Sequence, residues 1–370
     1  MRQSAIMLMA TGFLIVQAMS ASAAIAQPVW GNPEFRIVQA EALAMLDRRA
    51  GDLAAKDQLS GVMLIETNGE VVYLDHWGLA DRGTDLPVTL NTRFRLGSSG
   101  KMFTAVAILQ LVEAGRLSLD GTVGDYLPDY PNRSIADQVT IRQMLTHTGG
   151  TGDIFTPEYE ALRDQTRTLA DYVSLFGARE ALFEPGSQSG YSNYGFVLLG
   201  RIVEAVSGQN YYDYLRDHVF EPAGMNDTGA LPEKTVMPQR AVGYMRENDR
   251  WVPATATLPY RGSPAGGGYS TVFDLLRFAH ALQNGTLLSP AMVRAATTPQ
   301  NPDGWYGYGF VTAGEGPTAF YGHGGGAPGM NSDFRVYPDQ NTIIITLSNF
   351  DPPVANDLAE YYEDRMAAIR

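Results

Sequence analysis

Ser98-Ser99-Gly100-Lys101 opens an apolar run, residues 102–115, whose pattern predicts a helix. Positions three apart lie on one face of a helix, so we expect the Ser98 hydroxyl and the Lys101 amine side by side. A serine hydroxyl is activated when a neighbouring base takes its proton, and a desolvated lysine can be that base. The helix N-terminus adds backbone N–H groups where negative charge develops. The spacing therefore predicts a serine nucleophile; a capping serine at the start of a core helix is the alternative.

The rest of the chain places strands near both ends and helices between them. Apolar runs at 61–66 and 70–74 flank Asn68-Gly69, a strong signal for a β-hairpin. Further strands are expected at 308–312, 319–323, 332–337 and 342–348, the last two joined by a turn at 338–341. Helices are expected at 35–56, 141–145, 169–176, 195–207, 271–283 and 357–370.

This order predicts an α+β chain whose sheet combines strands from both ends. We expect residues 27–370 to form a single domain of two lobes. An α/β lobe would contain residues 33–104 and 262–370, and residues 105–261 would form an inserted, mostly helical lobe.

Residues 1–26 have the pattern of a secretory signal peptide. A positively charged start is followed by an apolar stretch and by small residues before Gln27. We expect cleavage after Ala26 or after Ala23. The apolar stretch is too short and too interrupted by polar residues for a transmembrane anchor. The sequence therefore predicts a periplasmic or secreted protein with no stable membrane insertion after cleavage.

The composition excludes several classes of function. The 370 residues include no cysteine and carry a net charge of −13. Disulfides and thiolate metal sites are therefore absent, and the acidic excess argues against nucleic acid and anionic membranes as partners. Four of the five histidines, His76, His147, His218 and His280, lack metal-ligand spacing. We predict no metal and no cofactor, and a small molecule as the substrate.

Tyr191-Ser192-Asn193 lies in a glycine-rich loop just before a predicted helix. A phenol near Lys101 can relay a proton to a leaving group. The Asn193 carboxamide can hold a substrate amide and orient Lys101. Taken alone, these three residues are typical of a turn and helix cap.

His323-Gly324-Gly325-Gly326 follows an apolar strand. Glycines let the backbone come close to a ligand, and their N–H groups can complete an oxyanion hole with the N–H of Ser98. A glycine-rich β turn is the alternative. The HGGG motif of α/β-hydrolase lipases does not fit, because it precedes a G-x-S-x-G nucleophile and this chain has no G-x-S-x-G.

The three motifs, in the order S-x-x-K, Y-x-N and H-x-G, resemble those of the penicillin-recognising serine hydrolases. That superfamily contains class C β-lactamases, D-Ala-D-Ala carboxypeptidases and family VIII carboxylesterases. The resemblance covers residues 35–350 and is carried by segments 94–98, 141–150, 191–200, 220–225, 265–271 and 322–326. It implies a β-lactamase/transpeptidase-like α+β fold, with an antiparallel sheet built from N- and C-terminal strands, flanking helices and an inserted, mostly helical lobe.

The resemblance also implies roles for the matching residues. Ser98 would be the acylated nucleophile, Lys101 its base and Tyr191 the catalytic tyrosine. Gly326 would supply the second oxyanion N–H. The residues expected to bind substrate or the oxyanion are Ser98, Asn193, His323, Gly324, Gly325 and Gly326.

The third motif departs from its relatives. His323 replaces the lysine of the family's K-T-G triad, and Gly324 replaces its hydroxyl residue. Because that lysine helps to bind the substrate carboxylate, efficient turnover of β-lactams is not expected here. The chain also lacks the E-x-x-L-N segment that supplies a deacylating glutamate in class A β-lactamases.

We therefore predict a secreted serine hydrolase that forms and hydrolyses an acyl-enzyme on a small ester or a D-amino-acid amide or peptide. A class C-like β-lactamase is one alternative. A non-catalytic penicillin-binding or sensor module on the same fold is another, although Ser98, Lys101 and Tyr191 are all present. An acyltransferase differs only in whether an amine or water takes the acyl group, and the sequence leaves this open.

Overall fold

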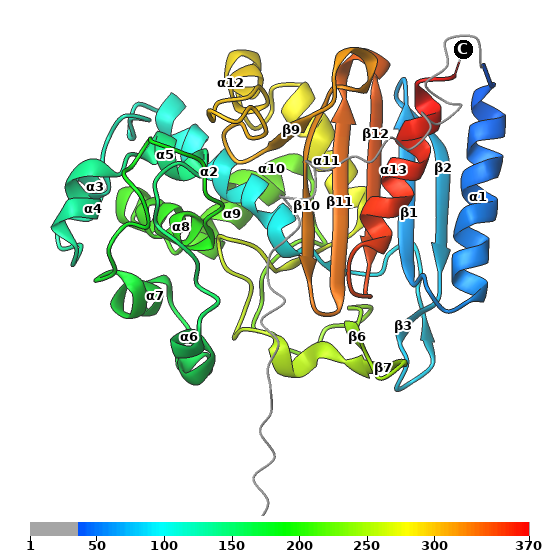
Figure 1. Cartoon of the computed structure of the whole chain (residues 1–370), viewed down its shortest axis with the longest axis horizontal. Coiled ribbons are helices and arrows are strands. Elements are labelled where there is room, and N and C mark those ends of the chain that lie inside the picture. The colour runs from blue at the N-terminus through cyan, green and yellow to red at the C-terminus, as the bar shows by residue number, and fades with distance from the viewer. Residues whose placement is uncertain (1–35, 370) are drawn as a thin grey trace, which may run out of the picture.

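The computed structural model describes residues 36–369 and contains one large antiparallel sheet (Figure 1). The strand order is β2-β1-β12-β11-β10-β9. Its strands are β1 (Gly61–Thr67), β2 (Glu70–Trp77), β9 (Val311–Ala313), β10 (Phe320–Ala327), β11 (Met330–Tyr337) and β12 (Thr342–Ser348). Because β1 pairs with β12, from Gly61 opposite Ser348 to Thr67 opposite Thr342, the predicted sheet of N- and C-terminal strands is confirmed.

Three two-stranded ladders supplement the sheet. They are formed by β3 (Leu79–Asp81) with β4 (Leu86–Pro87), β5 (Phe94–Arg95) with β8 (Tyr269–Ser270), and β6 (Tyr244–Glu247) with β7 (Arg250–Pro253). The β6–β7 hairpin was not predicted from the sequence; it lies below the large sheet, near β3 (Figure 1). The Tyr244 N–H donates to Asn349 O at 2.8 Å, which ties this hairpin to the end of β12.

Helices cover both faces of the sheet and fill the space beside it. Those nearest the sheet are α1 (Gln39–Ala55), α11 (Val272–Gln283), α12 (Pro290–Ala296) and α13 (Val354–Met366). Those in the middle of the chain are α2 (Lys101–Glu113), α3 (Val123–Tyr126), α4 (Arg133–Gln138), α5 (Ile141–Leu145), α6 (Pro157–Leu162), α7 (Leu169–Phe176), α8 (Asn193–Ser207), α9 (Tyr211–Leu215) and α10 (Glu221–Ala223). No described helix is long and apolar enough to span a bilayer.

Alternation along β1 explains why both faces of the sheet are covered. Successive side chains of a strand point to opposite faces. Met63 and Ile65 belong to the hydrophobic cluster shared with α1 and α13, whereas Val62 and Leu64 belong to the cluster shared with α11. All four side chains are buried and apolar, so residues 62–65 do not alternate in polarity.

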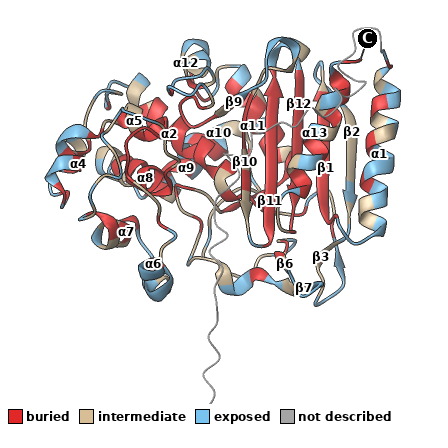
Figure 2. Cartoon of the chain, in the orientation of Figure 1, coloured by how far each residue is buried: buried red, intermediate tan, exposed pale blue. Residues whose placement is uncertain are grey.

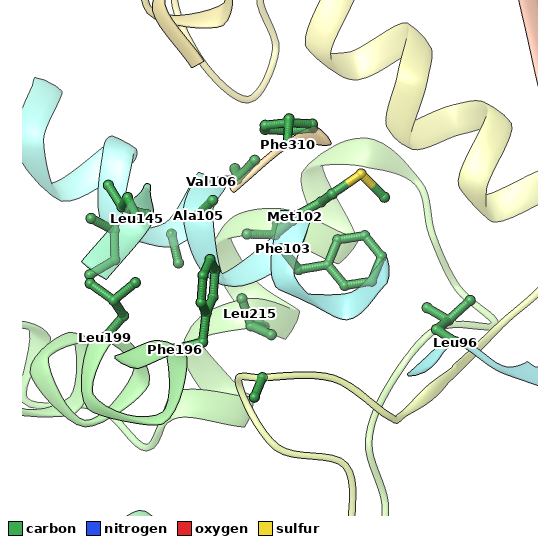
Figure 3. Packing of buried hydrophobic residues seen from close by; sticks show 14 of the residues in the cluster. Leu96, Met102, Phe103, Ala105, Val106, Leu145, Phe196, Leu199, Leu215 and Phe310 are labelled. Atoms are coloured by element: carbon green, nitrogen blue, oxygen red, sulfur yellow. The ribbon is translucent and has the colours of Figure 1, made fainter. Parts of the chain in front are cut away.

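Helix α2 is the buried centre of the helical region (Figure 2). Ten of its 13 residues are buried, as expected for a helix that is apolar all round. Met102, Phe103, Ala105 and Val106 pack among side chains from α5, α8, α9 and the segment before β9 (Figure 3). The labelled partners are Leu145, Phe196, Leu199, Leu215 and Phe310. This packing gives the first residues of α2 a rigid support.

Several element boundaries differ from the expectations. The strand predicted to end at residue 323 continues as β10 through the glycines to Ala327, so residues 324–326 are strand rather than the alternative β turn. Helix α2 begins at Lys101, and a 3-10 turn, η2 (Gly97–Gly100), precedes it. The predicted signal peptide lies outside the described residues.

Candidate active site

The turn η2 presents Ser98 next to Lys101. Side chains three apart eclipse one another in a 3-10 turn, and Lys101 Nζ lies 3.3 Å from Ser98 Oγ. The two groups therefore meet as the spacing predicts, although the local structure is a tighter turn than the expected α-helix. Ser99 points elsewhere, because its Oγ donates to His323 O at 2.8 Å.

Lys101 is fully buried and has two further acceptors. Its Nζ donates to Asn193 Oδ1 at 2.7 Å and to the backbone carbonyl of Ala265. Burial disfavours the ammonium form and lowers the pKa of Lys101 to about 7, although the negative charge of Asp153 opposes this shift. A large fraction of Lys101 is therefore neutral near pH 7.

Tyr191 contacts both Ser98 and Lys101. Its phenol hydrogen-bonds with Ser98, and Lys101 Nζ lies 4.7 Å from the centroid of its ring. Burial raises the pKa of Tyr191 above its usual value, so the phenol stays protonated at neutral pH. Ser98 thus contacts both an amine that is partly neutral near pH 7 and a protonated phenol.

Asn193 links Lys101 to a carboxylate that the sequence analysis did not identify. Its Nδ2 donates to Asp153 Oδ1 at 3.0 Å and to Oδ2 at 3.2 Å. Its two polar ends are therefore both engaged, one by an ammonium or amine and the other by a carboxylate. Asp153 follows the segment 141–150 by three residues, but no spacing in the sequence relates it to Lys101.

His147 packs beneath Tyr191. The two ring centroids are 4.2 Å apart, and His147 Nδ1 accepts the N–H of Ser192 at 3.1 Å. Burial, with Lys101 and His323 nearby, holds the pKa of His147 well below its ordinary value. No spacing in the sequence relates His147 to the three motifs; the structure places it against the site, where it supports Tyr191-Ser192-Asn193.

His323 is buried, and both of its ring nitrogens are engaged. Nδ1 lies 2.5 Å from Gly324 O, and Nε2 lies 2.9 Å from the hydroxyl of Tyr306. Since a carbonyl only accepts, Nδ1 carries the proton and Nε2 accepts from Tyr306. Burial and the nearby Lys101 lower the pKa of His323 to about 3, so the ring is neutral at physiological pH. Tyr306 is a second residue that sequence reasoning missed.

The glycines of β10 cross the nucleophile turn at very short range. A methyl group added to Gly325 would lie 1.9 Å from Leu96 O and 2.9 Å from Ser98 N, which no structure tolerates without displacement. A methyl group on Gly97, whose φ is +52°, would lie 3.0 Å from Gly326 N. Both positions therefore need glycine. Because β10 crosses η2 here, the backbone N–H groups of Ser98 and Gly326 lie near each other.

The structure thus gathers Ser98, Lys101, Tyr191 and Asn193 with residues 323–326 at one place. Within residues 36–369, no group of three or more histidine, aspartate or glutamate side chains is arranged to hold a metal ion. In this arrangement the Ser98 hydroxyl contacts a base, Lys101, and a phenol, Tyr191, and backbone N–H donors lie beside it.

Comparisons with known proteins find a matching family model and similar sequences. The family model described as Beta-lactamase matches residues 46–368. A putative penicillin-binding protein, PbpX, of Bacillus subtilis is 33% identical over 292 residues, covering 78% of this chain and 70% of its own length.

Two solved structures are similar over most of their length. A penicillin-binding protein from Bacillus halodurans superposes with a TM-score of 0.77 and 33% identity, covering 85% of this chain and 99% of its own. A D-amino acid amidase from Ochrobactrum anthropi, solved with L-phenylalanine amide, gives a TM-score of 0.75 and 25% identity, covering 89% and 98%. These similarities confirm the predicted β-lactamase/transpeptidase-like fold.

Proposed function

This chain belongs to the Beta-lactamase family of serine hydrolases, and we propose that it cleaves small esters and D-amino-acid amides or peptides through an acyl-enzyme. The observation that carries the proposal is the contact of Ser98 with both Lys101 and Tyr191, beside a third motif that has no free cation. The D-amino acid amidase with the same fold supports the choice of amide substrates.

Acylation begins with the proton of Ser98. When Lys101 is neutral, its two N–H bonds point to Asn193 Oδ1 and Ala265 O, which leaves the nitrogen lone pair for the Ser98 hydroxyl. Ser98 Oγ attacks the substrate carbonyl carbon while its proton passes to Lys101 Nζ. The N–H groups of Ser98 and Gly326 donate to the oxygen that becomes negative.

Tyr191 completes the transfer. Its phenol gives a proton to the leaving amine or alkoxide as the C–N or C–O bond breaks, and it regains a proton from the Lys101 ammonium. Water then attacks the acyl-enzyme. Its proton returns along the same residues to Ser98 Oγ, and the acid product is released.

The charge of the site favours substrates without a carboxylate near the reacting carbonyl. Lys101 is buried and its three hydrogen-bond partners all lie within the protein. His323 is neutral, and neither of its ring nitrogens is available. An anionic β-lactam therefore finds no cation in this motif, whereas acyl transfer from an uncharged ester uses only groups that are present.

We expect kcat/KM to be higher for short-chain nitrophenyl esters than for penicillins or cephalosporins. Because the pKa of His323 is about 3, its imidazolium is absent above pH 5, so β-lactam hydrolysis should not increase relative to ester hydrolysis as the pH falls toward 6. The measurement is kcat/KM for both substrates between pH 5.5 and 8.5, with a D-amino-acid amide as a third substrate.

His323→Lys is the matched variant for this experiment. A lysine here restores the missing cation, and β-lactam activity should then increase at pH 8 while the ester rate does not. Circular dichroism confirms that the variant is folded. Efficient β-lactam hydrolysis by the wild type at pH 8, with no increase in His323→Lys, would contradict the proposed substrate class.

Tyr191→Phe should lower the rate by about 10²-fold or more, because it removes the proton donor while it keeps the ring against His147. Ester kcat and circular dichroism are measured together. Tyr260→Phe, at an exposed tyrosine, is the control and should retain the wild-type rate. A wild-type rate in Tyr191→Phe would reduce Tyr191 to a packing residue.

The location of the enzyme is also a proposal. We propose that residues 1–26 direct export and that the mature enzyme acts in the periplasm or outside the cell. The charged start, the apolar stretch and the small residues before Gln27 support it.

A further inference from the structure

A line of three contacts connects a carboxylate to the nucleophile. Asp153 accepts from Asn193 Nδ2 at 3.0 and 3.2 Å, Asn193 Oδ1 accepts from Lys101 Nζ at 2.7 Å, and Lys101 Nζ lies 3.3 Å from Ser98 Oγ. We propose that Asp153 is a positioning residue: it fixes the Asn193 amide toward Lys101 and supports the positive charge that Lys101 gains during acyl transfer. This inference rests on the proposed role of Lys101 as the base.

The carboxylate is built into its loop. Asp153 Oδ1 accepts the N–H of Ile154 at 2.6 Å and the N–H of Phe155 at 3.2 Å. The loop is held to the start of α8, because Ser192 Oγ donates to Gly152 O at 2.6 Å. These backbone donors fix the direction of the carboxylate. Asp153 therefore presents a carboxylate held in one place to Asn193.

The orientation of the Asn193 amide decides which atom Lys101 meets. An amide has an accepting oxygen at one end and a donating nitrogen at the other, and a half-turn exchanges them. A carboxylate accepts only, so Asp153 selects the orientation in which Nδ2 faces it and Oδ1 faces Lys101. In the reversed orientation, Nδ2 would donate to the lone pair of neutral Lys101. That lone pair would then be unavailable for the proton of Ser98.

The charge of Asp153 has a second effect. Asp153 is the acid whose charge acts on Lys101 and on Tyr191, and it opposes the lowering of the Lys101 pKa by burial. The other titratable groups around Lys101 are the Tyr191 phenol and the two imidazoles, His147 and His323. Burial and the charge of Lys101 hold both imidazoles neutral. Removing the Asp153 charge therefore makes the Lys101 ammonium less stable, and its pKa falls.

The test is the rate at which a neutral fluorophosphonate labels the full-length protein between pH 5 and 9. This rate depends on Ser98 and its base, and not on the identity of the natural substrate. The acid limb is the pH range in which the labelling rate rises as Lys101 loses its proton. In Asp153→Asn, we expect this acid limb to move to lower pH by about half a unit or more, because an opposite charge near the base has been removed. The limiting rate at high pH should fall roughly tenfold, because the Asn193 orientation is no longer fixed.

Two further variants make the result specific. Asp164→Asn makes the same chemical change at an exposed position and should leave the profile unchanged. Asp153→Ser also removes the charge, but its hydroxyl can still accept from the loop N–H groups, so it preserves the turn. The acid limb of Asp153→Ser should also move to lower pH. If Asp153→Asn does not fold, Asp153→Ser alone tests whether the charge of Asp153 acts on Lys101.

The outcomes separate the inference from the proposed function. An acid limb that stays at the wild-type pH in the folded Asp153 variants, whatever the limiting rate, overturns the inference and leaves Asp153 a structural role. A wild-type protein that is not labelled at any pH overturns the proposed function, and the inference with it.

Discussion

Replacing Ser98 with alanine should abolish labelling by a fluorophosphonate and lower ester turnover by about 10⁴-fold or more, because loss of a covalent nucleophile removes the whole acylation route. The neighbouring serine, Ser99, cannot replace Ser98 as the nucleophile. Ser99 is buried, and its Oγ donates to His323 O, away from Lys101. Intact-mass analysis after labelling detects the adduct. Ser98 is half-buried, so thermal unfolding of the variant should stay near that of the wild type.

Ser192→Ala is the matched control for this experiment. Ser192 Oγ accepts from Gly195 N at 2.9 Å and caps α8, so its loss should lower stability by about 1 kcal/mol. The variant should still be labelled at Ser98. Labelling that persists in Ser98→Ala and disappears in Ser192→Ala would show that the nucleophile has been assigned to the wrong residue.

Lys101→Met should separate activity from stability. Methionine has nearly the volume of lysine and no basic nitrogen, so the ester rate should fall by about 10³-fold or more through loss of the base. The same change removes a buried amine that is costly to keep charged. The midpoint of thermal unfolding should therefore stay the same or rise. Steady-state kinetics and a melting curve on one preparation measure both effects.

Lys234→Met, at an exposed lysine, is the control and should change neither quantity. An ester rate within tenfold of wild type in Lys101→Met would rule out Lys101 as the base. A collapse of both activity and stability would make Lys101 a packing residue whose contacts with Asn193 and Ala265 matter for folding.

The parts of the fold that could be predicted are those with a local signal. Runs rich in apolar and β-branched residues located β1, β11 and β12, and Asn68-Gly69 located the first hairpin. The Ser98 to Lys101 spacing predicted a contact between neighbours along the chain, and such contacts follow from backbone geometry alone. The pairing of the sheet across the chain was predicted from the order of elements.

The rest depends on tertiary contacts that no local pattern encodes. Glycine is a poor strand former, so residues 324–326 looked like a turn. They are strand because β10 pairs with β11 and because only glycine fits where β10 crosses η2. Asp153, His147 and Tyr306 reach the site from segments whose positions are fixed by packing, not by spacing.

The β6–β7 hairpin was missed for a different reason. Its strands are short and largely exposed, so they lack the apolar alternation that marks a strand. A signal was nevertheless available at its turn. Asn248 and Asp249 both have positive φ, as a two-residue hairpin turn requires, and both residue types tolerate that conformation.

The pairing of β1 with β12 has a consequence for biosynthesis. Gly61 pairs with Ser348, so strands from the two ends of the chain must meet before the centre of the sheet can form. Contacts between residues so far apart in the sequence make folding slow. A ribosome-bound chain that already contains Ser98, Lys101 and Tyr191 still lacks β10 and its partners. The nascent chain therefore lacks the N–H of Gly326 and the strand that crosses η2, so we expect a reactive Ser98 only after β10 has paired with β11.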